Sequence, residues 1–231
     1  MKSPWTDMLR LLFPATCYHC GRRLVGDERY FCMHCQLDMP FTHNAAVGDN
    51  ETELRIGGRI PVKAGASLLY YQNEMCSKTL LHQIKYYGHY KMAYDYGSLL
   101  GKEIAQSGRF DDVDCLVPVP LHWIKKWRRG YNQSELLSRG IQASFDRPIC
   151  KDVLYRKRYT QTQTHKSQEQ RIENMQDVFA VKNTSKLEGR HILLVDDVIT
   201  TGATSDSCWS ALKTIPGIRI SIASLAIATS H

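Results

Sequence analysis

One segment of the 231-residue chain constrains its fold more than any other. It is an apolar run, His191–Val195, that ends in two adjacent acids, Asp196 and Asp197. A small, hydroxyl-rich turn follows at Thr200–Thr204, and the pattern beyond it predicts a helix over Thr204–Lys213. Ligands of open parallel sheets bind at the carboxyl ends of the strands. This order of strand, acids, turn and helix therefore predicts an α/β fold with a site at that strand end.

The residue types in this segment indicate what the site binds. Threonine hydroxyls, a glycine that lets the backbone approach, and the positive end of a helix dipole together suit one phosphate group. The predicted phosphate-binding residues are Thr200, Thr201, Gly202, Ala203 and Thr204. Two neighbouring carboxylates suit the two hydroxyls of a ribose. The alternative is a helix cap, a solvated acid and an ordinary turn, which explains each residue singly but not their combination. The Walker pattern of nucleoside triphosphatases is absent.

Strand and helix patterns alternate through the rest of the body. Helices are predicted where apolar residues recur at helical spacing, and strands where short apolar runs end in turn residues. The predicted strands are Ala66–Tyr71, Asp114–Val119, Val153–Tyr155, His191–Val195 and Ile218–Ile227. Besides Thr204–Lys213, the predicted helices are Met75–Lys85, Lys91–Ala105, Asn132–Ala143 and Gln168–Met175. This alternation predicts a mostly parallel sheet flanked by helices on both faces.

A small cysteine-rich head precedes this body. Two Cys-x2-Cys pairs are separated by 11 residues and supply four candidate metal ligands, Cys17, Cys20, Cys32 and Cys35. Four thiolates with no open position favour a structural zinc site in a zinc-ribbon-like hairpin. An iron–sulfur cluster, four cysteines without a metal, and substitution by His19 or His34 are the alternatives. Asn44–Glu53 is polar and is predicted to be a linker or loop, so we divide the chain into a zinc-binding head and linker, 1–59, and a second domain, 60–231.

Charge and hydropathy limit the partners and the location. The chain has 30 Lys and Arg against 23 Asp and Glu. The excess lies in two segments, Leu121–Tyr131 with four basic residues and Lys151–Arg171 with six basic and two acidic ones, which favours anionic ligands. The longest uncharged apolar run, Ile220–Ser230, is shorter than the roughly 20 residues that span a membrane. With no signal-peptide pattern at the N-terminus, we expect no membrane insertion and a cytoplasmic location.

The motifs together resemble a known family. Val195–Thr204 resembles the phosphoribosyl pyrophosphate signature of type I phosphoribosyltransferases. With the four-cysteine head, it is similar to the ComF (competence protein F) family, which is amidophosphoribosyltransferase-like. Three further stretches resemble motifs of that family: Leu81–Gly88, Val117–Pro120 with Arg128–Gln133, and Thr160–Thr164 with Arg171 and Asn174.

The resemblance implies a fold, a ligand and roles for individual residues. The fold would be type I phosphoribosyltransferase-like, and Asp196 and Asp197 would be the catalytic pair that contacts the ribose hydroxyls. Magnesium would bind with phosphoribosyl pyrophosphate and need few protein ligands. The pyrophosphate and lid positions would be Lys85, Pro118, Val119, Pro120, Arg128, Arg129, Arg158, Thr164 and Arg171.

Three functions follow as hypotheses. The first is a magnesium-dependent transfer of a phosphoribosyl group to an unknown acceptor, linked by the family to DNA uptake and natural transformation. The second is a non-catalytic sensor of phosphoribosyl pyrophosphate. The third is a single-stranded DNA-binding competence factor that works with other DNA-uptake proteins. For that factor, Trp123, Trp127 and Tyr131 lie among basic residues, as stacking and phosphate contact require. The alternative, which we favour, is an amphipathic helix with both tryptophans buried.

Overall fold

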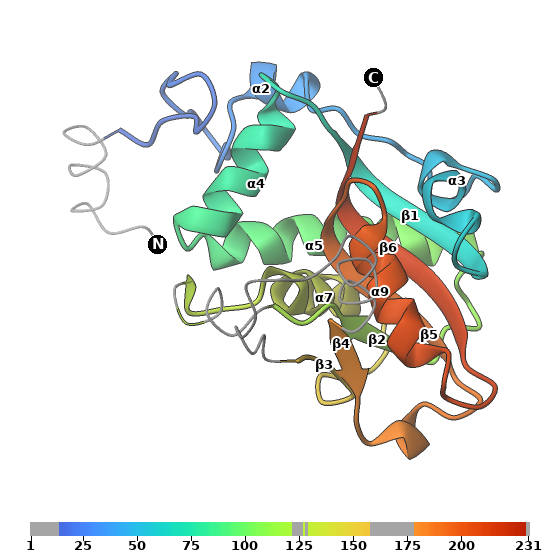
Figure 1. Ribbon diagram of the computed structural model, residues 1–231. Helices are drawn as coiled ribbons and strands as arrows, with labels where there is room; N and C mark the ends of the chain where they lie inside the picture. Colours follow the sequence, from blue (N-terminus) through green and yellow to red (C-terminus); the bar gives the residue numbers. More distant parts are fainter. Residues whose placement is uncertain (1–13, 122–126, 128, 158–177, 230–231) are drawn as a thin grey trace, which may run out of the picture.

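A four-stranded sheet forms the centre of the molecule (Figure 1). The computed structural model describes residues 14–121, 127, 129–157 and 178–229. The strand order is β1-β6-β5-β2, and every neighbouring pair is parallel. These strands are β1 (Val62–Tyr71), β2 (Cys115–Pro118), β5 (His191–Ile199) and β6 (Arg219–Ala228). A short antiparallel hairpin, β3 (Leu154–Arg156) and β4 (Phe179–Val181), lies beside the sheet. The predicted parallel sheet is therefore confirmed.

Helices cover both faces of this sheet. The helices of the described residues are α2 (Met33–Leu37), which belongs to the cysteine-rich head, α3 (Glu51–Gly57), α4 (Cys76–Tyr86), α5 (Tyr90–Ser107), α7 (Gln133–Ser144) and α9 (Ala203–Leu212), with a 3-10 turn, η1 (Thr184–Lys186). Alternate residues of β5 enter two different cores: Leu193 and Val195 pack with α4, α5 and α7, whereas Ile192 and Leu194 pack with α9. Since both faces of the strand are buried, its sequence is a continuous apolar run and not an alternating one.

The predicted helices and strands of the body are present in the described residues, with ends shifted by at most four residues. The largest difference that bears on the site is in β5, which continues through the two acids to Ile199. Pairing with β6 explains this extension, because Val198 lies opposite Ala226 and Ile199 opposite Ile227. The predicted helix Gln168–Met175 lies outside the described residues. Strand β4 was not predicted.

Glycines allow α5 and α7 to pack with their backbones in contact. A Cβ atom at Gly97 or Gly140 would overlap a carbonyl oxygen of the facing helix, and one at Gly101 would lie 2.6 Å from the carbonyl oxygen of Ile141. No larger residue fits at these positions without separating the helices. This contact fixes α7, whose first turn borders the site described below.

The segment Asn44–Glu53, predicted to be a linker or loop, is a loop up to Asn50 and is packed into the molecule. Asn50 and Thr52 are buried, and α3 begins directly after Asn50. The Asn50 side chain caps this helix by accepting a hydrogen bond from the Thr52 N–H at 3.0 Å. A buried hydroxyl chain runs from Thr52 through Ser67 to Ser224, with 2.8 Å between successive oxygens. The loop is therefore confirmed up to Asn50, whereas Glu51–Glu53 belong to α3, and the polar groups of the segment can be buried because they satisfy one another and need no water.

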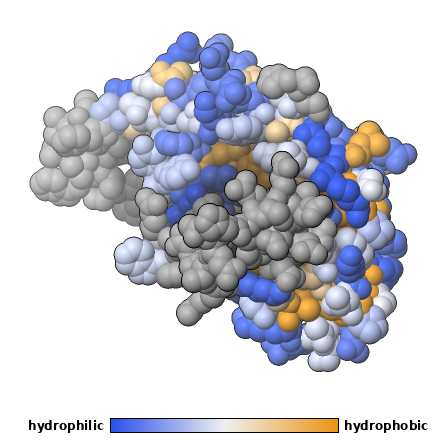
Figure 2. Space-filling view, viewed as in Figure 1, coloured by the Kyte–Doolittle hydropathy of each residue, from blue (hydrophilic) through white to orange (hydrophobic). Residues whose placement is uncertain are grey.

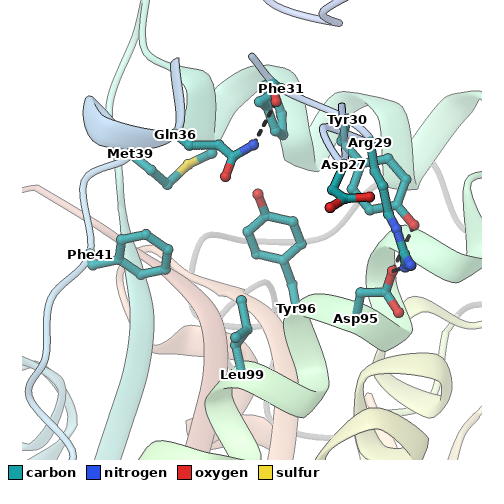
Figure 3. A pocket seen from close by; sticks show the side chains of 10 residues that line it. All are labelled: Asp27, Arg29, Tyr30, Phe31, Gln36, Met39, Phe41, Asp95, Tyr96 and Leu99. Atoms are coloured by element: carbon teal, nitrogen blue, oxygen red, sulfur yellow. Dashed lines mark hydrogen bonds and ion pairs between the residues drawn. The ribbon is translucent and has the colours of Figure 1, made fainter. Parts of the chain in front are cut away.

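Residues between Asp27 and Phe41 lie against α5 (Figure 3). The Tyr30 hydroxyl donates to the Asp95 carboxylate at 2.8 Å, and Arg29 lies 3.8 Å from the same carboxylate. Beside these contacts, Figure 3 shows Tyr96 pointing from α5 toward the head, between Phe41 and the Tyr30–Asp95 pair. A pocket of about 290 Å³ opens along this seam. Polar and apolar contacts therefore both hold the cysteine-rich head against the body.

Candidate functional site

The two acids lie at the carboxyl end of β5, as predicted, but in different surroundings. Asp196 is 7 % exposed and accepts a hydrogen bond from the Asp197 N–H at 2.8 Å. Burial, followed by the negative charge of Asp197, raises the pKa of Asp196 to about 7, although the hydrogen bond from the Asp197 N–H and the charge of Lys85 act in the opposite direction. The Asp197 carboxylate is half-buried and lies 3.0 Å from the Lys85 Nζ atom on α4. Two such carboxylates can accept hydrogen bonds from two neighbouring hydroxyls of a sugar.

The turn after β5 has the geometry of an anion site. Gly202 has a φ of +81°, a conformation that favours glycine, and its carbonyl accepts the first helical hydrogen bond of α9 from Asp206 at 2.9 Å. The loop is held from the opposite side by two arginines of the α3 region. Arg55 donates to the Thr200 carbonyl at 2.8 Å, and Arg59 donates to the Thr201 carbonyl. The Ala203 N–H donates to the Thr201 hydroxyl at 3.4 Å, and the start of the ten-residue helix α9 is of the kind that binds anions.

A pocket of about 170 Å³ joins the acids to the turn, and we call it the donor pocket. Its cationic side chains are Lys85, Arg129 and Arg156. Three basic groups beside two carboxylates can neutralise a polyanion that carries hydroxyls. The pocket is lined by Lys85, Val119, Pro120, Leu121, Arg129, Asn132, Gln133, Ser134, Arg156, Asp196, Asp197, Val198 and Thr204.

Four of the residues predicted for pyrophosphate binding line the donor pocket: Lys85, Val119, Pro120 and Arg129. Pro118 does not, because it is the last residue of β2 and is buried in the sheet. The other predicted positions, Arg128, Arg158, Thr164 and Arg171, lie outside the described residues.

Several residues of the site have roles that the sequence did not indicate. Asn132 caps α7 by accepting a hydrogen bond from the Ser134 N–H at 3.1 Å, and its amide donates to the Val119 carbonyl at 2.9 Å. Arg55 and Arg59 were missed because their region was predicted to be a linker. The motif Arg128–Gln133 indicated that Asn132 belongs to the site. A motif alone does not show which backbone groups the side chain hydrogen-bonds.

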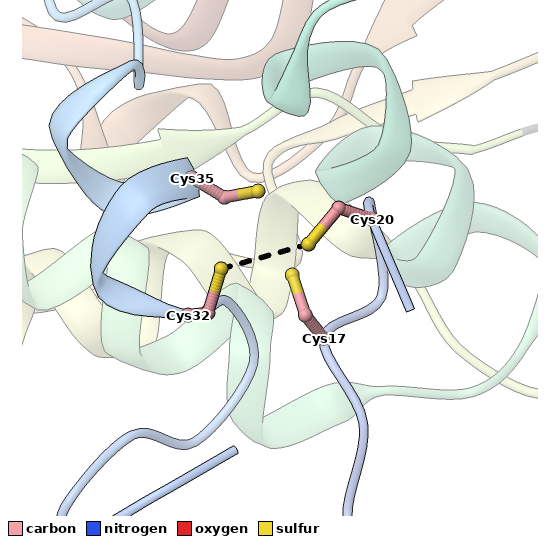
Figure 4. Close-up of side chains that lie close together, drawn as sticks. All are labelled: Cys17, Cys20, Cys32 and Cys35. Atoms are coloured by element: carbon pink, nitrogen blue, oxygen red, sulfur yellow. Dashed lines mark hydrogen bonds between the residues drawn. The ribbon is translucent and has the colours of Figure 1, made fainter. Parts of the chain in front are cut away.

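The four cysteines of the head come together at a second, separate site (Figure 4). Their sulfur atoms all lie within 4.8 Å of one another, and those of Cys20 and Cys32 are 3.6 Å apart. Sulfur atoms around a tetrahedral zinc ion lie roughly 3.7 Å apart, so the set fits such an ion. His19 and His34 are engaged elsewhere, with Thr79 at 3.0 Å and Asp38 at 3.6 Å. The group of four thiols therefore needs no histidine to complete it.

The sheet and the strand-end site define the class of protein. Residues 128–230 match the model of the phosphoribosyl transferase domain, and the chain has the type I fold of that class, with a parallel sheet flanked by helices. A solved structure, glutamine phosphoribosylpyrophosphate amidotransferase from Bacillus subtilis, aligns with 64% of this chain and 30% of its own at 20% identity and a TM-score of 0.42.

Curated relatives identify the family within that class. Competence protein F of Haemophilus influenzae is 34% identical over 85% of this chain and 78% of its own length. Competence protein ComFC of Bacillus subtilis is 28% identical over 81% of this chain and 73% of its own. The DNA utilization protein YhgH of Escherichia coli K12 is 35% identical over 54% of this chain and 56% of its own. The chain belongs to the competence protein F (ComF) family. None of the helices in the described ranges is both long and apolar enough to cross a bilayer.

Proposed function

We propose that this protein binds phosphoribosyl pyrophosphate with Mg²⁺ in the donor pocket and transfers its phosphoribosyl group to an acceptor. The observation that carries the proposal is the convergence of Asp196, Asp197 and Thr204, the last residue of the turn, on one pocket with three cations. The acids would accept hydrogen bonds from the ribose hydroxyls, and the turn would bind the 5-phosphate. Magnesium would be held mainly by the substrate's own oxygens.

The reaction needs positioning and charge stabilisation more than a nucleophilic side chain. Loss of pyrophosphate leaves positive character on the ribose, which the carboxylates at the end of β5 would stabilise. Lys85 and Arg129 would neutralise the leaving pyrophosphate, together with backbone N–H groups near Val119. Val119 itself is held by its N–H, which donates to the Val195 carbonyl at 2.9 Å.

Calorimetric titration with phosphoribosyl pyrophosphate and Mg²⁺, followed by an assay of pyrophosphate release, tests the proposal. We expect the double variant Asp196→Asn, Asp197→Asn to lose binding and any turnover together. Asp146→Asn, which removes an exposed carboxyl away from the pocket, is the matched control. Unchanged binding in the double variant would refute the site. Binding without release from any acceptor would instead support a sensor of phosphoribosyl pyrophosphate.

A second candidate function is binding of single-stranded DNA, and one relative is named a DNA utilization protein. Trp127 is 83 % exposed, contrary to the burial we favoured from its helical spacing, whereas Trp123 lies outside the described residues. Tyr86 and Tyr87 are exposed nearby in sequence to the pocket residue Lys85, and the Arg129 guanidinium lies 5.3 Å from the centre of the Tyr86 ring. Exposed rings beside cations suit base stacking and phosphate contact. Affinity for an oligonucleotide should then fall steeply with salt; a salt-independent affinity would count against it.

We further propose that the four-cysteine cluster holds structural zinc and that the chain divides into a zinc-binding head with its linker, 1–59, and a phosphoribosyltransferase-like domain, 60–231. Four thiolates persist in a reducing compartment, which supports a cytoplasmic location. Other DNA-uptake proteins are the partners that the competence relatives suggest.

A further inference from the structure

A second pocket lies where the cysteine-rich head meets α5, and we call it the seam pocket. It has a volume of about 290 Å³, and none of the residues that line it also lines the donor pocket. Pockets for free small molecules usually have volumes of roughly 300–1,000 Å³. The seam pocket is therefore a separate site, and its size suits a single side chain.

The floor of the seam pocket carries a buried hydroxyl that has no partner. Tyr96 is 8 % exposed and points from α5 toward the head (Figure 3). Its hydroxyl makes no hydrogen bond to any residue that the structure describes. The hydroxyl of a buried tyrosine usually has a hydrogen-bond partner. Burial also raises the pKa of Tyr96, so the hydroxyl stays neutral and can both donate and accept. A ligand in the pocket would supply the missing partner.

Two further groups at the rim of the pocket can accept hydrogen bonds. The Gln36 amide nitrogen donates to the Phe31 carbonyl at 2.7 Å, which leaves the amide oxygen on the side of Tyr96 (Figure 3). The Asp27 carboxylate has no hydrogen bond or ion pair with any described residue, and it lies across the Tyr96 ring from Phe41. The unpartnered groups of the rim are thus acceptors, which suit a ligand that carries N–H groups.

The charges of the lining leave one carboxylate uncompensated. The lining contains two carboxylates, Asp27 and Asp95, and one guanidinium, that of Arg29. Asp95 accepts the hydrogen bond from Tyr30 and lies 3.8 Å from Arg29, so Asp27 is the group without a counter-charge. The chain as a whole carries a net charge of +7, so this negative site is a local feature. The pocket therefore favours one positive charge and disfavours phosphates and carboxylates.

Aromatic and apolar side chains form the remaining wall. Met39 is buried beneath the head, and the rings of Phe41 and Tyr96 line the pocket. A guanidinium group is planar, stacks on aromatic faces and has five N–H groups that point in several directions. Because Asp27 and Gln36 lie in different directions from the Tyr96 ring, this fork fits them better than the compact ammonium of lysine.

The rim of the pocket indicates a protein as the source of this group. Leu99 lines the pocket and is 40 % exposed, and Leu37, next to Gln36 in the chain, is 77 % exposed. On the face of the molecule shown in Figure 2, hydrophobic residues form small patches among hydrophilic ones. On surfaces of this kind, protein interfaces are anchored by arginine and aromatic side chains in pockets, with nearly neutral contacts around them.

We propose that the seam pocket receives an arginine side chain of a partner protein. The guanidinium donates to the Asp27 carboxylate, the Gln36 amide oxygen and the Tyr96 hydroxyl, and its plane stacks on Phe41. The exposed leucines of the rim contact apolar residues that flank the arginine. Since Asp27 and Gln36 belong to the head and Tyr96 belongs to α5, the partner binds the head and the body at once.

The test titrates the full-length, zinc-loaded protein with blocked tripeptides and follows the tyrosine ring signals by NMR. The probe is leucine-arginine-leucine with both ends blocked. The matching citrulline peptide keeps the shape of arginine without its charge, and the matching lysine peptide keeps the charge without the planar fork. Ethylguanidinium represents a free cation. Tyr96→Phe identifies the Tyr96 signals, because they disappear from its spectrum.

Two pairs of variants separate the pocket from its surroundings. Asp27→Asn removes the uncompensated charge, and Asp146→Asn, at an exposed acid outside the pocket, is its control. Leu99→Trp fills the pocket from its rim, and Tyr94→Trp, at an equally exposed position of α5 outside the pocket, is its control. Circular dichroism of each variant checks that it is folded.

We expect the arginine peptide to shift the Tyr96 signals until they saturate, and the citrulline peptide to bind at least roughly tenfold more weakly. Asp27→Asn and Leu99→Trp should each weaken binding of the arginine peptide about tenfold, whereas the two controls should change it less than about twofold. Ethylguanidinium should bind at least roughly tenfold more weakly than the peptide, because it lacks the flanking leucines.

The proposal is overturned if the arginine peptide leaves the Tyr96 signals unchanged, if the citrulline peptide binds as tightly, or if Asp27→Asn keeps full affinity. Equal affinity for the lysine peptide would refute the choice of arginine, and equal affinity for ethylguanidinium would show a site for a free cation. A wild-type dimer in sedimentation that Leu99→Trp dissociates and Tyr94→Trp does not would make a second copy of this chain the occupant, and would refute a different partner. Binding of phosphoribosyl pyrophosphate is tested separately, because the two pockets share no residue.

Discussion

Replacement of Asp196 by asparagine should make the protein more stable above neutral pH while it weakens ligand binding. Asparagine keeps an oxygen to accept the hydrogen bond from the Asp197 N–H but carries no charge. The carboxyl of Asp196 has its pKa raised from 3.8 to about 7, mainly by burial and then by Asp197. Between these two values the native state holds a proton that the unfolded chain has lost, so the free energy of unfolding falls as pH rises.

The size of this effect on the free energy of unfolding follows from the rise in the pKa of Asp196. Each pH unit of difference corresponds to about 1.4 kcal/mol, so the buried carboxylate costs at most about 4 kcal/mol above pH 7. Structural relaxation around the buried carboxylate reduces this ceiling, and we expect Asp196→Asn to gain on the order of 1–2 kcal/mol at pH 8. The gain should grow as pH rises from about 5.5 to 7 and then level off.

Urea unfolding of the zinc-loaded protein between pH 5.5 and 8, followed by circular dichroism, measures this difference directly. Asp146→Asn is the control: because its carboxyl is exposed, its effect should stay within about 0.5 kcal/mol at every pH. A loss of stability in Asp196→Asn at pH 8, or a difference that does not change with pH, would show that the buried acid is not under electrostatic strain. If Asp196→Asn gains stability but loses affinity for its ligand, the carboxyl group is retained for binding and not for stability.

Three further sets of substitutions test the α5–α7 contact, the turn after β5 and the four-cysteine cluster. Gly140→Ala would place a Cβ against the Tyr94 carbonyl oxygen, so it should lower the free energy of unfolding, measured in urea, by about 2–4 kcal/mol. The control Gly57→Ala has open space around the new Cβ and should leave the free energy of unfolding nearly unchanged. Gly202→Ala combines a φ of +81° with a Cβ 3.0 Å from Arg59, and should cost about 1–2 kcal/mol and weaken phosphoribosyl pyrophosphate binding at least tenfold by calorimetry. The double variant Cys32→Ser, Cys35→Ser should reduce the zinc content, measured by elemental analysis, from one ion per chain to none. Amide hydrogens should then exchange faster in the head but not in β5. Zinc retained by the double variant would contradict the assignment of four thiolate ligands.

The sequence was informative where local chemistry and fold agree. The apolar run of β5, the two acids and the glycine turn are contiguous, so one segment indicates both the strand and the site at its end. The two Cys-x2-Cys pairs are equally local, and the four sulfur atoms do come together. In each case the signal is a short run of residues whose spacing already determines their geometry.

Contacts between segments that are distant in the chain could not be predicted from the sequence. Nothing in the composition of Asn44–Glu53 distinguishes a solvated loop from a buried polar network, because the partners, Ser67 and Ser224, lie on strands elsewhere in the chain. The arginines that hold the turn after β5, Arg55 and Arg59, are about 145 residues away from it and were missed for the same reason. Trp127 was predicted to be buried, because tryptophan at helical spacing usually faces a core, but its side chain is exposed.

The run Arg128–Gln133 explains how three separate segments reach one site. The Tyr131 hydroxyl donates to the Ile84 carbonyl and so fixes the end of α4, where Lys85 faces Asp197. The next residue, Asn132, holds the Val119 carbonyl, and the Val119 N–H in turn donates to β5. Two adjacent side chains therefore tie α4 and the loop after β2 to the same strand end through backbone groups. Tyr131 therefore acts by positioning, whereas Arg129, Asn132 and Gln133 of the same run also line the donor pocket.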